Sequence, residues 1–184
     1  MQISSNDINI DRLRDPATHR EEFDRLIDRY TEPLYRHVRR LVVVHEDAED
    51  VVQETFIRAY GHIGEFRGSA QELSAWLYRI ATNTAFSALR HYKRGLFSSI
   101  DSPCVLRELK QRLMETCEPN TDAGLIRFQQ VVLGLPLKQR LVFNLRYYDE
   151  MPYGQIARIL NQKEESLKVN YHYAVRKIKE EMTK

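Results

Sequence analysis

Acidic side chains are concentrated in one short segment of this chain, where they offer either ligands for a metal ion or a charged surface for a protein partner. Residues 46–54 read Glu-Asp-Ala-Glu-Asp-Val-Val-Gln-Glu, and no Lys or Arg lies between His45 and Ile57. Asp50 and Glu54 are one helical turn apart, and like charges at this spacing destabilise a helix by about 0.2–0.5 kcal/mol. A helix would rarely keep this arrangement for its own stability alone.

A metal-dependent reaction such as phosphodiester hydrolysis would take its ligands from the start of this segment. The available side chains are His45, Glu46, Asp47 and Asp50. They project from consecutive faces of one helix start, and no second cluster of ligands accompanies them in the sequence. We therefore expect no catalytic residues, no metal site and no cofactor.

Helix-end electrostatics provides a competing explanation for part of the acidic segment. Carboxylates near a helix start interact with the positive end of the helix dipole, and Asp47 is suited to cap the helix with Asp50 at its third position. Gln53 and Glu54 lie too far along the helix for such a role. The spacing alone leaves the helix-start explanation and the docking surface equally open.

Basic side chains are segregated from the acidic segment, although the net charge of the chain is only +2. They collect at residues 90–94 and 168–179. The first cluster ends a helix expected from about Gln71 to Arg94, on which a polar stripe is formed by Arg79, Asn83, Ser87, Arg90 and Arg94. Such a stripe can follow phosphates while Asn83 hydrogen-bonds an exposed base edge, although basic residues at a helix end also interact with the dipole.

Helical periodicity predicts the elements that position these groups. The acidic segment carries an apolar stripe on its other side, made of Ala48, Val51, Val52, Thr55, Phe56 and Ala59. A stripe from Phe23 to Leu41 predicts a preceding helix with a kink or restart at Pro33, and the glycines around Phe66 predict a loop before the long helix. Strand-like alternation does not compete with these patterns, so we predict an all-α fold with two helical domains.

The segment from Tyr153 to Met182 has the proportions of a helix-turn-helix. Asn161 falls where the chain must turn, and Asn tolerates left-handed backbone better than most residues. The outer face of the second helix presents Ser166, Lys168, Val169, His172, Tyr173 and Arg176. This mixture suits base edges and phosphates in a major groove, with a solvated basic helix as the alternative.

Residues 95–124 separate the two helical halves of the chain. Ser, Pro and Asn are scattered through this stretch, which predicts a linker that contains a short helix at residues 107–114. We therefore divide the chain into a first domain at residues 1–94, a linker at 95–124 and a second domain at 125–184.

Composition limits the classes of protein to which this chain can belong. Its 184 residues, 42% hydrophobic and 29% charged, are typical of a soluble globular protein. No apolar run approaches the length of a membrane span and no secretory leader is visible, so we expect no membrane insertion and a cytoplasmic location. Cys104 and Cys117 lack a metal-binding spacing and are expected to be free thiols.

Two ordered sets of motifs in this chain resemble the extracytoplasmic-function (ECF) sigma factors of the sigma-70 family. The segments that resemble sigma region 2 are Asp47–Phe56, Phe66–Gly68 and Trp76–Asn83. The segments that resemble sigma region 4 are Leu135–Tyr148 and Tyr153–Ala157. The resemblance identifies the first domain with region 2 and the second with region 4.

This resemblance implies a dissociable subunit that gives bacterial RNA polymerase its promoter specificity and has no catalytic activity of its own. In this family the acidic helix docks on the clamp coiled coil of the largest polymerase subunit, which assigns core binding to Glu49, Asp50, Gln53 and Glu54. Region 4 of the family contacts the flap of the other large subunit. An anti-sigma factor that covers these surfaces is a further expected partner.

The resemblance also assigns the contacts with promoter DNA. Region 2 would bind the -10 element as it opens, with Phe66, Arg67 and Gly68 corresponding to the loop that holds a flipped base. The polar stripe from Arg79 to Arg94 would contact the same element, and the outer face of the helix-turn-helix would read the -35 element. The recognition helix departs from the family pattern at Val169 and Asn170, so the -35 sequence is not predicted.

A helix-turn-helix regulator is the alternative function. Its first helical domain would sense a ligand or a phosphorylation event. Such a regulator binds specific DNA as the isolated chain, whereas a sigma factor needs core polymerase for tight promoter binding.

Overall fold

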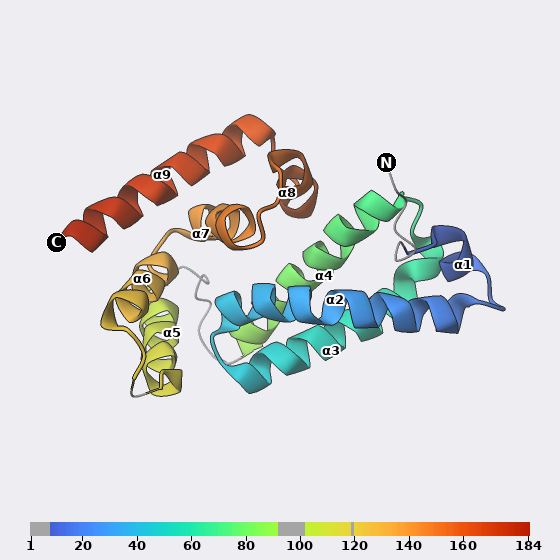
Figure 1. Cartoon of the computed structure of the whole chain (residues 1–184), viewed down its shortest axis with the longest axis horizontal. Helices are drawn as coiled ribbons and strands as arrows, with labels where there is room; N and C mark the ends of the chain where they lie inside the picture. The colour runs from blue at the N-terminus through green and yellow to red at the C-terminus, as the bar shows by residue number, and fades with distance from the viewer. Residues whose placement is uncertain (1–7, 92–101, 119) are drawn as a thin grey trace.

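The computed structural model describes residues 8–91, 102–118 and 120–184, which form helices joined by short loops (Figure 1). The first half contains α1 (Ile10–Arg14), α2 (His19–Val42), α3 (His45–His62), the 3-10 turn η1 (Ile63–Glu65) and α4 (Ala70–His91). The second contains α5 (Pro103–Thr116), α6 (Ala123–Leu133), α7 (Leu137–Phe143), the π-helical turn η2 (Asn144–Tyr148), α8 (Tyr153–Leu160) and α9 (Glu164–Thr183). The described residues contain no strand, which confirms the all-α prediction.

The helices α2, α3 and α4 form a bundle whose core follows the predicted periodicity. The whole predicted stripe of α3, from Ala48 to Ala59, is buried. The helix α2 continues through Pro33, so the restart predicted there does not occur. A proline inside a helix costs about 3 kcal/mol, and here Leu26 before it and Leu34 after it are both fully buried. Packing along the whole helix therefore outweighs the local cost.

The start of α3 differs from the predicted cap. The N-cap residue is Val44, and Asp47 lies in the first turn of the helix. Instead of capping, the Asp47 carboxylate accepts a hydrogen bond of 3.1 Å from Arg112 of α5. The cap prediction was wrong because it used local sequence only, whereas Arg112 is distant in sequence.

The start of α4 carries one half of a capping box, which the sequence analysis missed: the Glu72 side chain reaches back to Ser69. The Glu72 carboxylate accepts hydrogen bonds from the backbone N–H and the hydroxyl of Ser69, at 2.8 Å and 3.0 Å. The Ser-x-x-Glu spacing at residues 69–72 is the signal for this motif. The helix consequently begins at Ala70.

The helix-turn-helix is formed by α8 and α9, as predicted. Asn161 ends α8 in the left-handed region, with φ 52° and ψ 51°, which confirms its predicted role in the turn. Leu167, Ala174 and Ile178 of α9 are buried. The remaining face of α9 lies on the outside of the molecule, away from the α2–α4 bundle (Figure 1).

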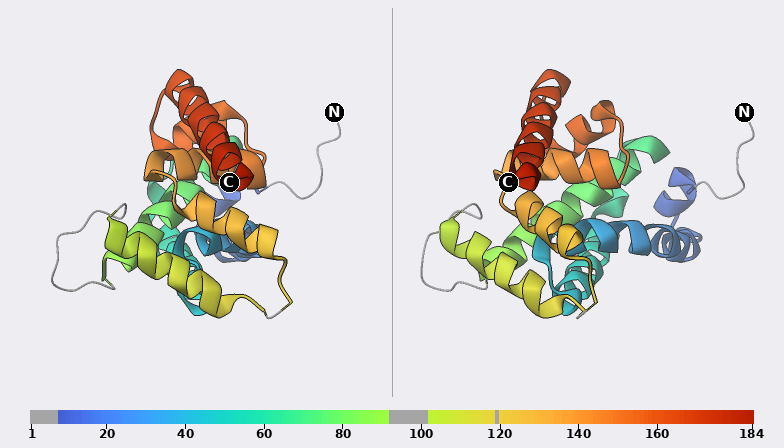
Figure 2. Two further views of the ribbon diagram at one scale, coloured as in Figure 1. Left: turned by 90° about the vertical axis from the view of Figure 1, so that its left-hand side faces the viewer. Right: turned by 60° about the vertical axis from the view of Figure 1, so that its left-hand side comes forward.

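The two halves of the chain pack directly against each other. The helix α8 lies beside α4, and one buried apolar cluster runs through both halves. The segment predicted as a linker contributes to this packing, because its helix α5 is longer than the predicted residues 107–114 and buries Leu109 and Leu113. The helices α5 and α6 run side by side near the end of α2 (Figure 2).

Candidate functional site

The predicted core-binding residues lie together on the outer face of α3, and part of their charge is paired within that helix. Glu49, Asp50 and Gln53 are exposed and Glu54 is half-buried. The Glu54 carboxylate accepts a hydrogen bond of 2.6 Å from Arg58, and Glu49 lies 3.3 Å from the ring of His45. Asp50 and Gln53 have no side-chain partner among the described residues. The acidic face is therefore less unbalanced than the sequence indicated, with Asp50 as its free charge.

An apolar groove of about 1130 Å³ between α2 and α3 adjoins this acidic face. Glu49, Asp50 and Gln53 line it together with Ile57 and Tyr60. Ile57 is 61% exposed and Tyr60 is 52% exposed, which is unusual for side chains of this size. Sequence reasoning missed these two residues because they lie outside the core stripe of α3. Their position could have been predicted, because both are large apolar residues that the helical periodicity places outside the buried face of α3.

The loop predicted to hold a flipped base is closely packed. The Phe66 ring lies 5.3 Å from the ring of Trp76, and the Phe66 carbonyl accepts a hydrogen bond of 2.9 Å from Arg14. Arg67 is exposed and donates to the Gly64 carbonyl at 2.6 Å. A Cβ on Gly68 would lie 2.5 Å from the Phe66 ring. A side chain at this position would therefore force the Phe66 ring to move.

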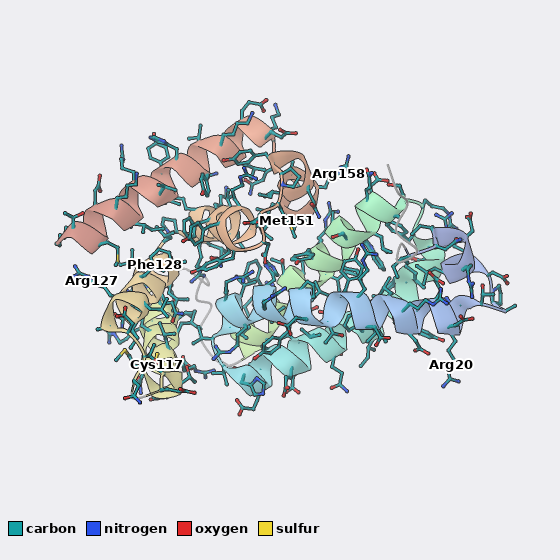
Figure 3. The ribbon with its side chains drawn as sticks, in the orientation of Figure 1. Arg20, Cys117, Arg127, Phe128, Met151 and Arg158 are labelled. Carbon is teal, nitrogen blue, oxygen red and sulfur yellow. The ribbon has the colours of Figure 1, made fainter. Side chains whose placement is uncertain are left out.

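The polar stripe of α4 is present, and α8 contacts one end of it at the exposed Arg79. Asn83 and Arg90 are exposed and Ser87 is half-buried, whereas Arg94 lies outside the described residues. Arg79 donates a hydrogen bond to the carbonyl of Arg158, which lies on α8 (Figure 3). One turn earlier, Gln155 of α8 donates to the Ser74 hydroxyl at 3.2 Å.

The predicted recognition face of α9 is fully exposed. Its members are Ser166, Lys168, Val169, His172, Tyr173 and Arg176, and all six are exposed. The Arg176 guanidinium lies 5.1 Å from the centre of the Tyr173 ring, and Lys168 lies 5.9 Å from that of Tyr153. These side chains share one uncovered surface that combines cations, hydrogen-bonding groups and an apolar side chain.

A buried polar cluster between the two halves was not predicted. Asp149, which follows η2, forms an ion pair with Arg40 of α2, and the Arg40 guanidinium stacks 4.7 Å from the centre of the Tyr148 ring. The Asp149 carboxylate also faces the fully buried His37, with Oδ2 3.7 Å from Nδ1. Met151, two residues further along the chain, is buried where η2 meets the rest of the fold (Figure 3).

Hydrogen bonds determine which nitrogen of His37 carries the proton. The Thr82 hydroxyl donates to the Tyr78 carbonyl at 2.7 Å, so it accepts from His37 Nε2–H at 2.9 Å. The neutral ring then presents the lone pair of Nδ1 to Asp149. Burial lowers the pKa of His37 more than the neighbouring Asp149 raises it. Burial alone would raise the pKa of Asp149, but the ion pair with the Arg40 guanidinium lowers it below its usual value.

Other kinds of site are not found in the described part of the chain. No group of three or more His, Cys, Asp or Glu side chains there is arranged to hold a metal ion. The helices of that part include none long and apolar enough to span a membrane. Cys104 and Cys117 form no disulfide.

A helical bundle with an acidic outer face, followed by a helix-turn-helix, matches two neighbouring regions of one class of transcription protein. Residues 26–95 match Sigma-70 region 2, and residues 125–178 match Sigma-70, region 4. The ECF RNA polymerase sigma factor SigW of Bacillus subtilis (strain 168) is 31% identical over 158 residues, which are 83% of this chain and 84% of SigW. The chain belongs to the ECF sigma factors of the sigma-70 family.

Two further similarities support this membership. The ECF RNA polymerase sigma factor BldN of Streptomyces coelicolor is 28% identical over 170 residues, covering 89% of this chain and 61% of BldN. The sigma factor RpoE of Bartonella quintana, solved in complex with the anti-sigma factor NepR, superimposes with a TM-score of 0.64 at 22% identity. That match covers 89% of this chain and 98% of RpoE, and it shows a shared fold.

Proposed function

We propose that this protein is the subunit that binds core RNA polymerase and directs it to a specific set of promoters. The acidic face of α3 docks on the clamp coiled coil of the largest polymerase subunit through Glu49, Asp50, Gln53 and Glu54. Region 4 contacts the flap of the second large subunit. The protein carries out no reaction itself and works in the cytoplasm, where the polymerase acts.

The observation that carries the docking proposal is the apolar groove beside the acidic face. Interfaces with protein partners combine exposed apolar anchors with a charged rim. Ile57 and Tyr60 supply the anchors, and Asp50 supplies an acid without an internal partner. Helix-end electrostatics does not explain the two apolar anchors, because a helix dipole needs no apolar groove.

Promoter DNA occupies two surfaces in this proposal. The exposed face of α9 reads the -35 element in the major groove, and residues 125–184 form the region 4 domain. The first domain, residues 1–94, binds the -10 element through Phe66, Arg67, Gly68 and the polar stripe of α4. Residues 95–124 connect the two domains. The sequence of either element is not specified by these contacts.

An anti-sigma factor is a further proposed partner. The Bartonella quintana relative was solved with such a protein bound. For this chain, the exposed apolar side chains of the α3 groove support the proposal, because a partner that covers them would also block polymerase. The class of partner is proposed by similarity, and its identity is left open.

Transcription in vitro with purified core polymerase and a library of promoters tests the function. We expect initiation from a subset of promoters only when both core and this chain are present. Specific, tight DNA binding by the isolated chain, with no effect on polymerase, would instead support a helix-turn-helix regulator.

Charge reversal tests the docking surface. We expect Asp50→Lys combined with Glu54→Lys to abolish core binding while circular dichroism shows an unchanged helical fold. Asp28→Lys, at an exposed acid of α2 that does not line the groove, is the matched control and should bind core normally. Undiminished core affinity of the double variant would refute the assignment.

A further inference from the structure

The short helix α1 packs on α2 and on η1, the turn that leads into the loop proposed to hold a flipped base (Figure 1). It lies before residues 26–95, the part of the chain that matches Sigma-70 region 2. Leu13 of α1 is buried, and so is Ile8, which precedes the helix. A helix of five residues has no stability of its own, so α1 depends on its contacts with the rest of the fold.

A buried carboxylate on α2 anchors α1. Glu22 is only 1% exposed, and its Oε1 accepts a hydrogen bond of 2.7 Å from the backbone N–H of Asn9, the N-cap of α1. Its Oε2 lies 3.4 Å from Arg12 Nε of α1 and 3.6 Å from the guanidinium of Arg25. A buried charge is costly without partners, and two of these partners come from α1 and its cap. The position of α1 on α2 is therefore fixed by this carboxylate.

Arg14, the last residue of α1, links this anchored helix to the loop. Its guanidinium donates twice to the Phe66 carbonyl, from Nη2 at 2.9 Å and from Nε at 3.2 Å. Arg67 donates to the same carbonyl at 3.2 Å and to that of Gly64 at 2.6 Å, but Arg67 belongs to the loop itself. Arg14 therefore ties the loop to another element of the fold. An arginine at a helix end also interacts with the dipole, but that interaction does not direct two donors at one distant carbonyl.

The ring of Phe66 is held by a different helix. Its centre lies 5.3 Å from that of Trp76 on α4, and the ring fills the space in which Gly68 would carry a Cβ. The carbonyl and the ring of one residue are thus fixed by α1 and α4 together. A loop held in this way is preorganised, so it needs little further ordering when it binds an extruded base.

We propose that Arg14 is a positioning residue for recognition of the -10 element, which holds the Phe66–Gly68 loop in the conformation that receives the flipped base. This role rests on the proposed function, because it serves the same DNA surface. Arg14 acts through the backbone of Phe66, to which its donors are already bound. Without Arg14 the loop keeps its ring contact with α4 but loses its bond to α1. The affinity for the base then falls with the fraction of molecules whose loop is in the receptive conformation.

The fluorescence of Trp76 tests the position of the loop in the isolated chain. Trp76 is the single tryptophan of the sequence and contacts the Phe66 ring, so its quenching by acrylamide reports on the loop. We expect Arg14→Ala to increase the quenching constant about 1.5-fold or more, because the loop opens more often, while circular dichroism shows an unchanged helix content. Arg107→Ala removes an equal charge from an exposed position of α5, at the other end of the molecule (Figure 1), and should leave quenching unchanged. Unchanged quenching in Arg14→Ala would overturn the positioning role.

Promoter templates with single abasic sites test the link to base capture. Each template carries a pre-melted -10 element in which one nucleotide lacks its base, and initiation is measured with core polymerase and the full chain. On the intact template, Arg14→Ala should reduce initiation about tenfold, the effect of losing one charge-assisted hydrogen bond. This defect should disappear at the position of the flipped base, because the loop then has no base to hold. An equal defect on every template would show a general loss of stability or charge and would overturn the proposal.

The two measurements distinguish this role from the proposed function. Absence of initiation by the wild type on every promoter would refute the proposed function, and base capture with it. Normal initiation by the wild type with unchanged Trp76 quenching in Arg14→Ala would refute the role of Arg14 alone. The fluorescence measurement requires no polymerase, so its result does not depend on the transcription assay.

Discussion

The two helices proposed to contact DNA differ in whether their DNA-binding faces also contact another part of the protein. The recognition face of α9 is fully exposed, whereas the polar stripe of α4 shares one end with α8 through Arg79 and Arg158. A face that is exposed can bind DNA in the arrangement seen here. Arg79, at one end of the α4 stripe, must release the Arg158 carbonyl before its guanidinium can bind DNA. The comparison indicates that the packed arrangement restricts the -10 surface and leaves the -35 surface available.

The two halves of the chain are held together by a shared buried apolar cluster and by one buried ion pair. Asp149 has only 9% of its side chain exposed and pairs with Arg40. Removing one member of a buried pair costs much more than removing an exposed one, because the remaining charge loses its partner. The Asp149–Arg40 pair is therefore the polar contact on which the packing of the two halves depends most strongly.

Asp149→Ala is expected to have the largest effect. Loss of the carboxylate leaves the Arg40 charge without its partner, which weakens the packing of the two halves by roughly 3 kcal/mol. The radius of gyration from small-angle X-ray scattering should increase, and α4 amides should exchange hydrogen faster. Glu150→Gln, at the adjacent exposed acid, is the control and should leave both measurements unchanged. An Asp149→Ala variant as compact as the wild type would contradict this role.

Acidification is expected to loosen the same interface through His37. Its pKa is lowered from the ordinary value of 6.5 in the packed arrangement. When the two halves separate, His37 therefore takes up a proton at a higher pH than it does in the packed arrangement. Packing is lost as the pH falls below the ordinary pKa of 6.5. Asp149 stays charged in this range because its own pKa is lowered. The buried Tyr78, whose pKa is raised, stays protonated throughout.

Scattering measurements between pH 7.5 and pH 5.5 test this expectation. The wild-type radius of gyration should increase on acidification, by less than it does in Asp149→Ala at neutral pH. His37→Gln retains a donor for Thr82 but cannot titrate, so its response to pH should be flat. A response of the same size in that variant would assign the effect to other groups.

DNA binding by the isolated chain tests the separate roles of α9 and α4. Lys168→Ala on the exposed α9 face should weaken binding to -35 DNA about fivefold and reduce its salt dependence by about one phosphate contact. Asn83→Ala on α4 should leave this binding unchanged and act only in the complete polymerase, where it should reduce discrimination of the -10 element. If both variants weaken DNA binding by the isolated chain equally, then α4 is able to bind DNA in the packed arrangement.

Sequence periodicity predicted the elements better than it predicted their contacts. The buried stripe of α3 and the left-handed Asn161 depend on local spacing, and both were correct. The partners of Asp47 and Asp149 lie far away in the sequence, so no local pattern could identify them. The pairing of Glu54 with Arg58 could have been predicted from the sequence, because a helix places residues four apart side by side. The individual polymerase and DNA contacts remain predictions.

The smallest expected effect concerns the helix starts, where α4 and α9 also differ. At α4 the Glu72 carboxylate accepts from the backbone N–H and hydroxyl of Ser69, whereas Lys163 precedes α9 without a side-chain cap. Lys163→Ser should stabilise α9 by about 0.5–1 kcal/mol, because serine can accept a hydrogen bond from an unpaired backbone N–H of the first turn. Chemical denaturation followed by circular dichroism measures the change. Ser69→Ala should produce a loss of similar size, and a loss without the corresponding gain would show that the start of α9 is already satisfied.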